Sequence, residues 1–143
     1  MSVVAAACRF CTIDDVATVR HSRLDRWSVG TISERPIPGW MLLWSDRHFE
    51  DLSEGTAEEL ASLGPILARV SNAIGREVDA ERVYITLFAD RTRHVHFLLA
   101  ALPRGYTGAR RAAALIADSD ELRDPASFRI VGEAVGRLLE AGR

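Results

Sequence analysis

The stretch "RTRHVHFLLA" (residues 91–100) places two histidines, His94 and His96, two positions apart in an apolar run. Side chains two positions apart share one face of a β-strand, so both imidazoles and Leu98 point one way while the apolar residues between them face the core. We therefore predict a strand over residues 93–102. Its two imidazoles lie about 7 Å apart along the strand, which is too far for them to share one metal ion easily. Separate roles are expected for them.

The surrounding sequence predicts further strands and helices. Aromatic and apolar runs predict strands over residues 27–33, 39–45 and 82–89, and the last of these is separated from the strand at 93–102 only by "DRT", which indicates an antiparallel pair. Helical spacing of apolar residues, with a capping box formed by Thr56 and Glu59, predicts a helix over residues 56–74. Two more helices are expected over residues 107–118 and 128–139, and the segment "RHSRLDRW" (20–27) is expected to be solvated.

This order of elements predicts an α+β fold in which an antiparallel β-sheet has helices packed on one face. The chain has 143 residues, of which 48% are hydrophobic, and this suits one globular domain with a core of ordinary size. Internal repeats and long linkers are absent from the sequence. Residues 1–143 are therefore expected to form a single domain.

Charge and hydropathy exclude several classes of partner. The formal net charge is -2 and there is no run of basic residues, so we expect no binding to duplex nucleic acid. All 18 basic residues are arginine, whose planar fork suits a small phosphorylated ligand. Uninterrupted apolar runs are only a few residues long, so no membrane association is expected. The N-terminal stretch lacks the basic region of a signal peptide, and we expect a cytoplasmic protein.

The only two cysteines, Cys8 and Cys11, form a C-x-x-C pair. In a reducing compartment this spacing favours metal or redox chemistry over a structural disulfide. Two histidines from elsewhere in the fold, with His48 and His94 as candidates, would complete a tetrahedral zinc site. The same residues also fit a metal-free protein with small buried cysteines. A redox role is the weaker alternative, because redox pairs usually open a helix after a strand and no strand is evident before Cys8.

His96 is a candidate nucleophile. A neutral imidazole can attack phosphorus and form a phosphoramidate, which water then hydrolyses. Such a site needs positive charge close to the phosphoryl oxygens, and Arg91, Arg93 and Arg104 are near enough in sequence to supply it. The alternative is a structural histidine on a half-buried strand face, with its ring nitrogens satisfied by hydrogen bonds.

Three segments together resemble the histidine triad family of nucleotide hydrolases and transferases. They are "CRFC" (8–11), "ISERPIPGWMLLWSDRHFEDLSEGTAEELASL" (32–63) and "VYITLFADRTRHVHFLLAALPR" (83–104), which match the family's motifs in order and spacing. The resemblance covers residues 8–104, the motif-bearing core, and leaves residues 105–143 as a C-terminal helical extension. It implies a histidine-triad-like fold, a homodimer, and His96 as the nucleophile that takes up a nucleoside monophosphate. It further implies a structural zinc ion held by Cys8, Cys11, His48 and His94.

The sequence also departs from the family pattern. Leu98 stands at the third triad position and can neither donate to a phosphate oxygen nor protonate a leaving group. The segment "FADRTR" (88–93) lacks the glycine that lets a backbone approach phosphate closely. Two functions are therefore expected. The first is a nucleotide phosphohydrolase or nucleotidyl transferase that acts on a nucleoside phosphoramidate or dinucleoside polyphosphate through a covalent nucleotidyl-histidine. The alternative is a catalytically degenerate, zinc-stabilised protein that binds a nucleotide or a protein.

Overall fold

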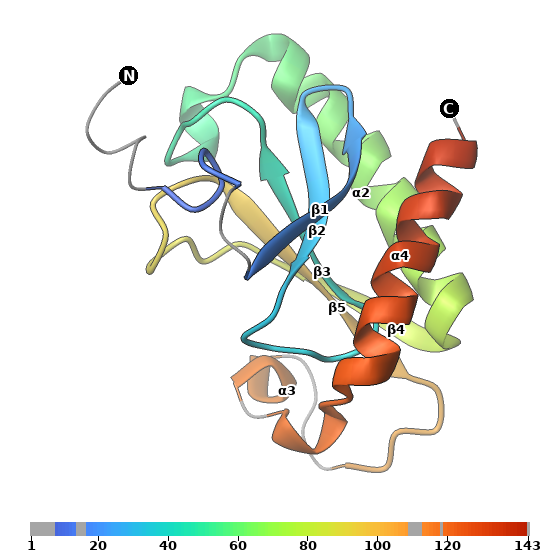
Figure 1. Ribbon diagram of the computed structural model, residues 1–143. Coiled ribbons are helices and arrows are strands. Elements are labelled where there is room, and N and C mark those ends of the chain that lie inside the picture. Colours follow the sequence, from blue (N-terminus) through green and yellow to red (C-terminus); the bar gives the residue numbers. More distant parts are fainter. Residues whose placement is uncertain (1–7, 14–16, 109–112, 118, 143) are drawn as a thin grey trace.

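The computed structural model describes residues 8–13, 17–108, 113–117 and 119–142. Within these ranges a single antiparallel sheet has the strand order β1-β2-β3-β5-β4. Its strands are β1 (Thr18–Leu24), β2 (Trp27–Ile32), β3 (Trp40–Ser45), β4 (Ala80–Thr86) and β5 (His96–Pro103). The helices α2 (Ala57–Val78) and α4 (Pro125–Ala141) lie side by side on one face of this sheet (Figure 1). The predicted α+β architecture, an antiparallel sheet with helices on one face, is confirmed.

Helix α2 begins at its predicted cap, whereas α4 begins at Pro125, three residues before the predicted start at residue 128. Thr56 accepts a hydrogen bond from the backbone N–H of Glu59, whose side chain accepts one from the N–H of Thr56, so the predicted capping box is present at the start of α2. α2 runs four residues beyond the predicted end, because Val78 still packs against the core. Asp124 caps α4 without a capping box, and its side chain accepts a hydrogen bond from the N–H of Ser127.

The segment expected to be solvated is instead the edge strand β1, which pairs with β2 through a two-residue turn at Asp25 and Arg26. Asp25 adopts the left-handed conformation that such tight turns need (φ 56°). The sequence signal is weak because an edge strand keeps polar residues on its outward face. Its inward-facing Ser22 donates to Glu140 of α4 at 2.7 Å, so a polar contact helps to attach this strand to the helix.

The strands around the two histidines are shorter at their facing ends than predicted. β4 ends at Thr86 and β5 begins at His96, so the connection spans residues 87–95 rather than a three-residue turn. The reason is that Val95 bonds to the loop after β3, where its N–H donates to the carbonyl of Phe49 at 2.8 Å. The predicted alternation is confirmed, since Phe97 lies in the main core between sheet and helices while His96 lies on the opposite face beside the ring of Phe10.

The remaining elements are short. The 3-10 turns η1 (Leu52–Glu54) and η2 (Asp120–Leu122) precede α2 and α4, and α3 (Ala113–Ala117) lies in the predicted helix over residues 107–118. Thr107 and Gly108 are not helical, and residues 109–112 and 118 fall outside the described ranges. In the part of the chain that the structure describes, no helix is long and apolar enough to cross a membrane.

The face of the sheet opposite the helices carries a second, smaller apolar cluster. It contains Cys8, Phe10, Leu42 and Trp44. Phe10 stacks on Trp44 with 5.1 Å between ring centroids, so the short segment before β1 covers the centre of β3. Every residue of β3 is consequently buried, by helices on one side and by this segment on the other.

Candidate metal centre and adjoining cavity

Four predicted ligands come together on the face opposite the helices. Cys8 and Cys11 lie on a tight turn, which we call the knuckle (residues 8–12), where the N–H groups of Cys11 and Thr12 both donate to the carbonyl of Cys8 at 3.0 Å. His48 follows β3 and His94 precedes β5. One ligand atom from each of these four residues lies within 4.8 Å of all the others. Residues separated by up to 86 positions therefore meet in one cluster.

The donor set fits a tetrahedral metal ion. Cys8 Sγ lies 3.3 Å from His94 Nδ1, and Cys11 Sγ lies 3.3 Å from His48 Nδ1 and 3.6 Å from His94 Nδ1. Around a zinc ion with arms of about 2.3 Å to sulfur and 2.0 Å to nitrogen, neighbouring S and N atoms are about 3.5 Å apart. Two thiols and two imidazoles are also the ligand types that structural zinc sites use.

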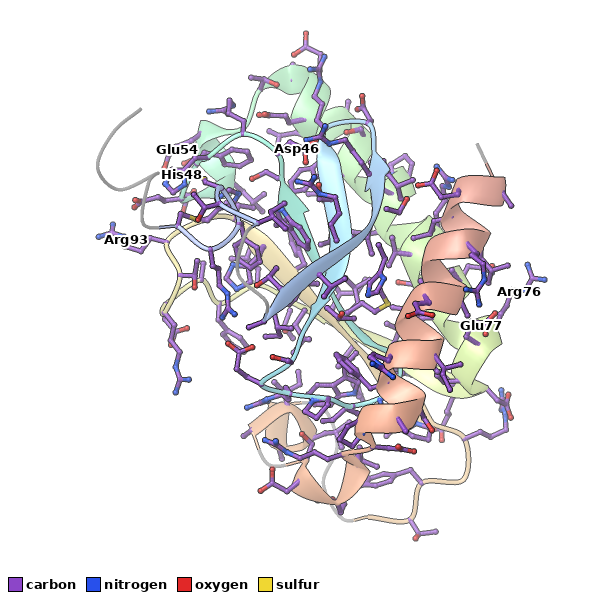
Figure 2. All side chains as sticks on the ribbon, in the orientation of Figure 1. Asp46, His48, Glu54, Arg76, Glu77 and Arg93 are labelled. Atoms are coloured by element: carbon purple, nitrogen blue, oxygen red, sulfur yellow. The ribbon has the colours of Figure 1, made fainter. Side chains whose placement is uncertain are left out.

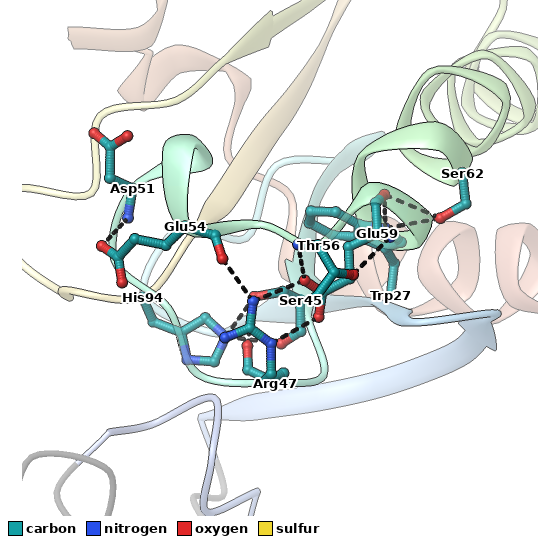
Figure 3. A network of polar contacts seen from close by, with 9 residues as sticks. All are labelled: Trp27, Ser45, Arg47, Asp51, Glu54, Thr56, Glu59, Ser62 and His94. Carbon is teal, nitrogen blue, oxygen red and sulfur yellow. Dashed lines mark hydrogen bonds and ion pairs between the residues drawn. The ribbon is translucent and has the colours of Figure 1, made fainter.

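Hydrogen bonds fix the orientation of His94. Its Nε2–H donates to the carbonyl of Ser45 at 2.7 Å, which leaves Nδ1 with the lone pair that faces the cysteines. Figure 3 shows how this contact continues, because the Ser45 hydroxyl donates to the carbonyl of Arg47, whose guanidinium binds the buried carboxylate of Glu59. The candidate ligand is thereby tied to the first turn of α2.

His48 is oriented by fewer contacts. Its Nε2 is buried and has no hydrogen-bond partner among the described residues, although Glu50 Oε1 lies 3.9 Å away. Glu50 itself forms an ion pair with Arg93 at 2.8 Å. Figure 2 shows His48 and Arg93 on the side of the molecule where the knuckle lies. At 3.9 Å, Glu50 is too far from His48 to accept a hydrogen bond from it.

Burial sets the protonation of these groups. It lowers the pKa of His94 to about 4, so this imidazole is neutral at neutral pH, as a metal ligand must be. Burial, followed by the hydrogen bond and charge of Cys8, raises the pKa of Cys11 to about 11. Reactive redox cysteines show the opposite shift, so this environment disfavours thiol exchange.

A cavity of about 450 Å³ adjoins the four ligands on the same face of the sheet. This volume is in the range of small-molecule sites. His96, Leu98, Arg9 and Phe10 contribute to its walls. The other lining residues come from the β2–β3 region, the end of β4, the loop that follows it and α3; they are Ile32, Glu34, Arg35, Trp40, Met41, Leu42, Thr86, Phe88, Ala89, Asp90, Arg91, Thr92, Ile116 and Ala117.

His96 presents one defined nitrogen for chemistry. Its Nδ1–H donates to the carbonyl of His94 at 2.7 Å, so Nε2 carries the lone pair. Burial lowers the pKa of His96; the hydrogen bond to His94 and the charge of Asp90 raise it, and the charge of Arg9 lowers it. The net direction is downward, so His96 is neutral at neutral pH.

The structure brings one of the three predicted phosphate-binding arginines to the cavity. Arg91 lines it, whereas Arg93 is engaged by Glu50 beside the ligand cluster. Arg104 pairs with Asp79 at 3.1 Å beyond the far end of β5, about 26 Å from His96 along an extended chain. Closeness in sequence does not give closeness in space here, because a strand carries each successive residue further away.

Sequence reasoning missed several residues of the cavity. Arg9 and Phe10 lie between the two cysteines, and Arg35 donates to the carbonyl of Ile116 and stacks over Trp40 at 5.9 Å from the ring centroid. A tight turn that points two cysteines inward must direct the residues between them elsewhere. That geometry is the signal that could have identified Arg9 and Phe10.

Comparison with known proteins supports the fold assignment. No protein-family model and no curated protein sequence matches the chain. Among solved structures, a hypothetical histidine triad nucleotide-binding protein of Sulfolobus tokodaii superposes with a TM-score of 0.70 at 16% identity, covering 94% of this chain and 93% of that one. A zinc-bound histidine triad family protein of Mycobacterium smegmatis gives 0.66 at 20% identity, covering 96% and 99%.

A uridylyltransferase is also similar, with a TM-score of 0.63 and 19% identity. The match covers 92% of this chain but 45% of that protein. The chain therefore has the histidine triad fold, as the resemblance in its sequence predicts, and it adds a cluster of two cysteines and two histidines suited to a metal ion.

Proposed function

We propose that this protein is a histidine-triad-type nucleotide phosphohydrolase or nucleotidyl transferase with His96 as its nucleophile. The observation that carries the proposal is the hydrogen bond from His96 Nδ1–H to the carbonyl of His94, which leaves an Nε2 lone pair on a neutral imidazole in the cavity wall. Similarity to a nucleotide-binding protein and to a uridylyltransferase supports the ligand class.

The proposed reaction has two displacements. The His96 Nε2 lone pair attacks the phosphorus of a nucleoside phosphoramidate or dinucleoside polyphosphate, and the bond from phosphorus to the leaving group breaks with its electrons on that group, which takes a proton from solvent water. Water then attacks the nucleotidyl-histidine and releases a proton to solvent, so the P–N bond breaks, nucleoside monophosphate leaves and His96 regains its lone pair. Arg91 lines the same cavity and adds positive charge there.

We also propose that the ligand cluster holds one structural zinc ion. The residues that would bind it are Cys8, Cys11, His48 and His94. A bound zinc ion would supply folding free energy by linking the knuckle to β3 and β5. In this arrangement the knuckle is held against the strand that carries His96.

Incubation of the purified protein with an adenosine phosphoramidate and a dinucleoside polyphosphate tests the catalytic proposal. Wild-type protein is expected to release adenosine monophosphate, and His96→Ala and His96→Asn are expected to lose at least about a thousandfold in turnover. Asn retains a donor for the His94 carbonyl, so it separates loss of the nucleophile from loss of local structure. Arg129→Ala removes an exposed arginine on α4 and serves as the control. Full turnover by both His96 variants would refute the mechanism.

A specific observation favours a second candidate function, a zinc-stabilised protein that binds nucleotide without turnover. Leu98 occupies the third triad position and lines the cavity, where it offers an apolar surface and no proton. The same assay distinguishes the two candidates. Binding of adenosine monophosphate by calorimetry, with no product from either substrate, would support this second function.

We propose a homodimer formed at the sheet edge. β4 is an edge strand of the described sheet, and Ile85, Leu87 and Phe88 at its end are 43%, 36% and 65% exposed. A two-fold axis beside this edge would place the same apolar residues of both copies together and pair the edge backbones. Light scattering is expected to give twice the chain mass, and Ile85→Lys is expected to weaken the dimer. A monomeric wild type would refute it.

A further inference from the structure

The knuckle reaches beyond the metal ligands into the cavity. Phe10 packs between Trp44 and His96, with 5.0 Å between its ring centroid and that of His96. Arg9 precedes Phe10 and lines the same cavity as His96. A turn that carries two candidate metal ligands therefore also supplies a cation near the proposed nucleophile.

Arg9 is held in a defined position. Its Nη2 donates to Glu34 Oε1 at 2.7 Å, and its Nε donates to Thr18 Oγ1 at 3.3 Å. The Arg9 side chain is 26% exposed, whereas that of Glu34 is 53% exposed. Arg9 is thus a partly shielded guanidinium bound to a carboxylate that can move into water. A guanidinium fork binds phosphate oxygens with the same geometry that it uses for a carboxylate.

The other charged residues that line the cavity are less suited than Arg9 to bind a phosphoryl group at His96. Arg35 is engaged by the Ile116 carbonyl and stacks over Trp40, and Arg91 is exposed on the loop after β4. Asp90 brings a negative charge near His96. Leu98 supplies no donor where a third imidazole would stand. A phosphoryl group at His96 consequently needs a cation from another element, and the knuckle provides one.

We propose that Arg9 binds the phosphoryl group that reacts at His96, and that Glu34 holds this guanidinium until a phosphorylated ligand replaces the carboxylate. This inference rests on the proposed function and names the residue that supplies the donor to phosphate oxygens that Leu98 lacks. The expected ligand is a phosphate ester of a nucleoside. Its phosphate takes the place of the Glu34 carboxylate on Arg9.

Binding of adenosine monophosphate and of adenosine, measured by calorimetry on the zinc-loaded protein, tests the role of Arg9. Arg9→Ala is expected to weaken binding of the monophosphate about tenfold or more and to leave adenosine binding unchanged. Arg9→Lys keeps the charge without the fork, and its affinity for the monophosphate is expected to lie between those of wild type and Arg9→Ala. Glu34→Gln removes the competing carboxylate and is expected to bind the monophosphate roughly threefold to fivefold more tightly. Arg129→Ala is the matched arginine control.

Zinc content and melting temperature are measured for each variant, because a loss of either shows that the knuckle is damaged. If Arg9→Ala damages the knuckle, the affinity of Arg9→Lys decides the outcome. Unchanged monophosphate affinity, or equal losses for monophosphate and adenosine, would overturn the role of Arg9. Turnover that depends on His96 but not on Arg9 would overturn this inference alone. Failure of the wild type to bind the monophosphate would overturn both this inference and the proposed function.

Discussion

The ligand cluster and the cavity lie side by side, and they use histidines two residues apart in opposite ways. Around His94 the environment is closed, since its side chain is fully buried and both ring nitrogens have defined partners. Around His96 it is open, because one nitrogen bonds to backbone and the ring borders a cavity that contains charges of both signs. The ligand cluster should therefore lose its metal when any one ligand is removed. The cavity can instead use a cation from a different element to bind the phosphoryl group.

Removal of one ligand is expected to have the largest effect and to break the closed site alone. Cys11→Ser should lose zinc and at least about 3 kcal/mol of stability, because the knuckle would no longer be linked to β3 and β5. Metal analysis and urea unfolding measure both. Thr12→Ser changes the next residue of the same turn and retains the hydroxyl that donates to Cys8, so it should keep zinc. Wild-type protein that contains no metal and is only as stable as Cys11→Ser would contradict the assignment of a zinc site.

The second prediction concerns the polar network behind His94. The hydrogen bond from Arg47 holds the pKa of Glu59 at about 2, below its ordinary value of 4.5. A lowered carboxyl pKa stabilises the fold above pH 4.5, and this contribution, on the order of 3 kcal/mol, is lost as the pH falls toward 2. Glu59→Gln should therefore be less stable than wild type at pH 7 and equal to it near pH 2.

Urea unfolding in the presence of a chelator measures this pH dependence without a contribution from metal loss. Glu58→Gln, at the exposed neighbouring position, should show the wild-type pH dependence. If Glu59→Gln retained the wild-type loss of stability in acid, another group would be responsible and the network would not have this role.

The third prediction tests the helix-covered face, which should be independent of the metal. A Cβ at Gly136 of α4 would lie 3.0 Å from both the Cβ and the backbone oxygen of His21, so Gly136→Ala should cost about 1–2 kcal/mol through crowding. Gly75→Ala in α2 meets nothing within 4 Å and should instead stabilise by about 0.5–1 kcal/mol. Unfolding curves with unchanged zinc content would support this separation of the two faces; zinc loss in Gly136→Ala would contradict it.

The smallest effect is expected from restoring an imidazole in the cavity. Leu98→His offers a donor to the phosphoryl group and should raise kcat/KM about tenfold while it changes stability by less than about 1.5 kcal/mol. Leu98→Met preserves volume without a donor and should leave kcat/KM unchanged. Equal activity of the two variants would show that the third triad position does not limit the reaction.

Local signals in the sequence were sufficient for the elements with strong patterns. The capping box at Thr56 predicts where α2 begins, and the alternation after His96 predicts which side chains of β5 face the core. Both signals lie within a few residues of the element and do not depend on distant partners. β1 was missed, since its inward-facing Ser22 is polar and is satisfied only by Glu140 on a helix more than a hundred residues away. The start of β5 lies at His96 and not at the predicted residue 93, because the hydrogen bond from Val95 to the distant Phe49 decides it.

The sequence by itself determined the ligand types, the fold class and the separation of His94 from His96, because these follow from residue chemistry and strand periodicity. Only the tertiary structure decided which cations reach the cavity. Arg104 follows β5 in sequence yet lies at its far end, whereas Arg9 comes from the N-terminal turn and lines the same cavity as His96. The reason is physical: an extended strand carries its own neighbours apart, and residues that share a site meet through packing between distant segments.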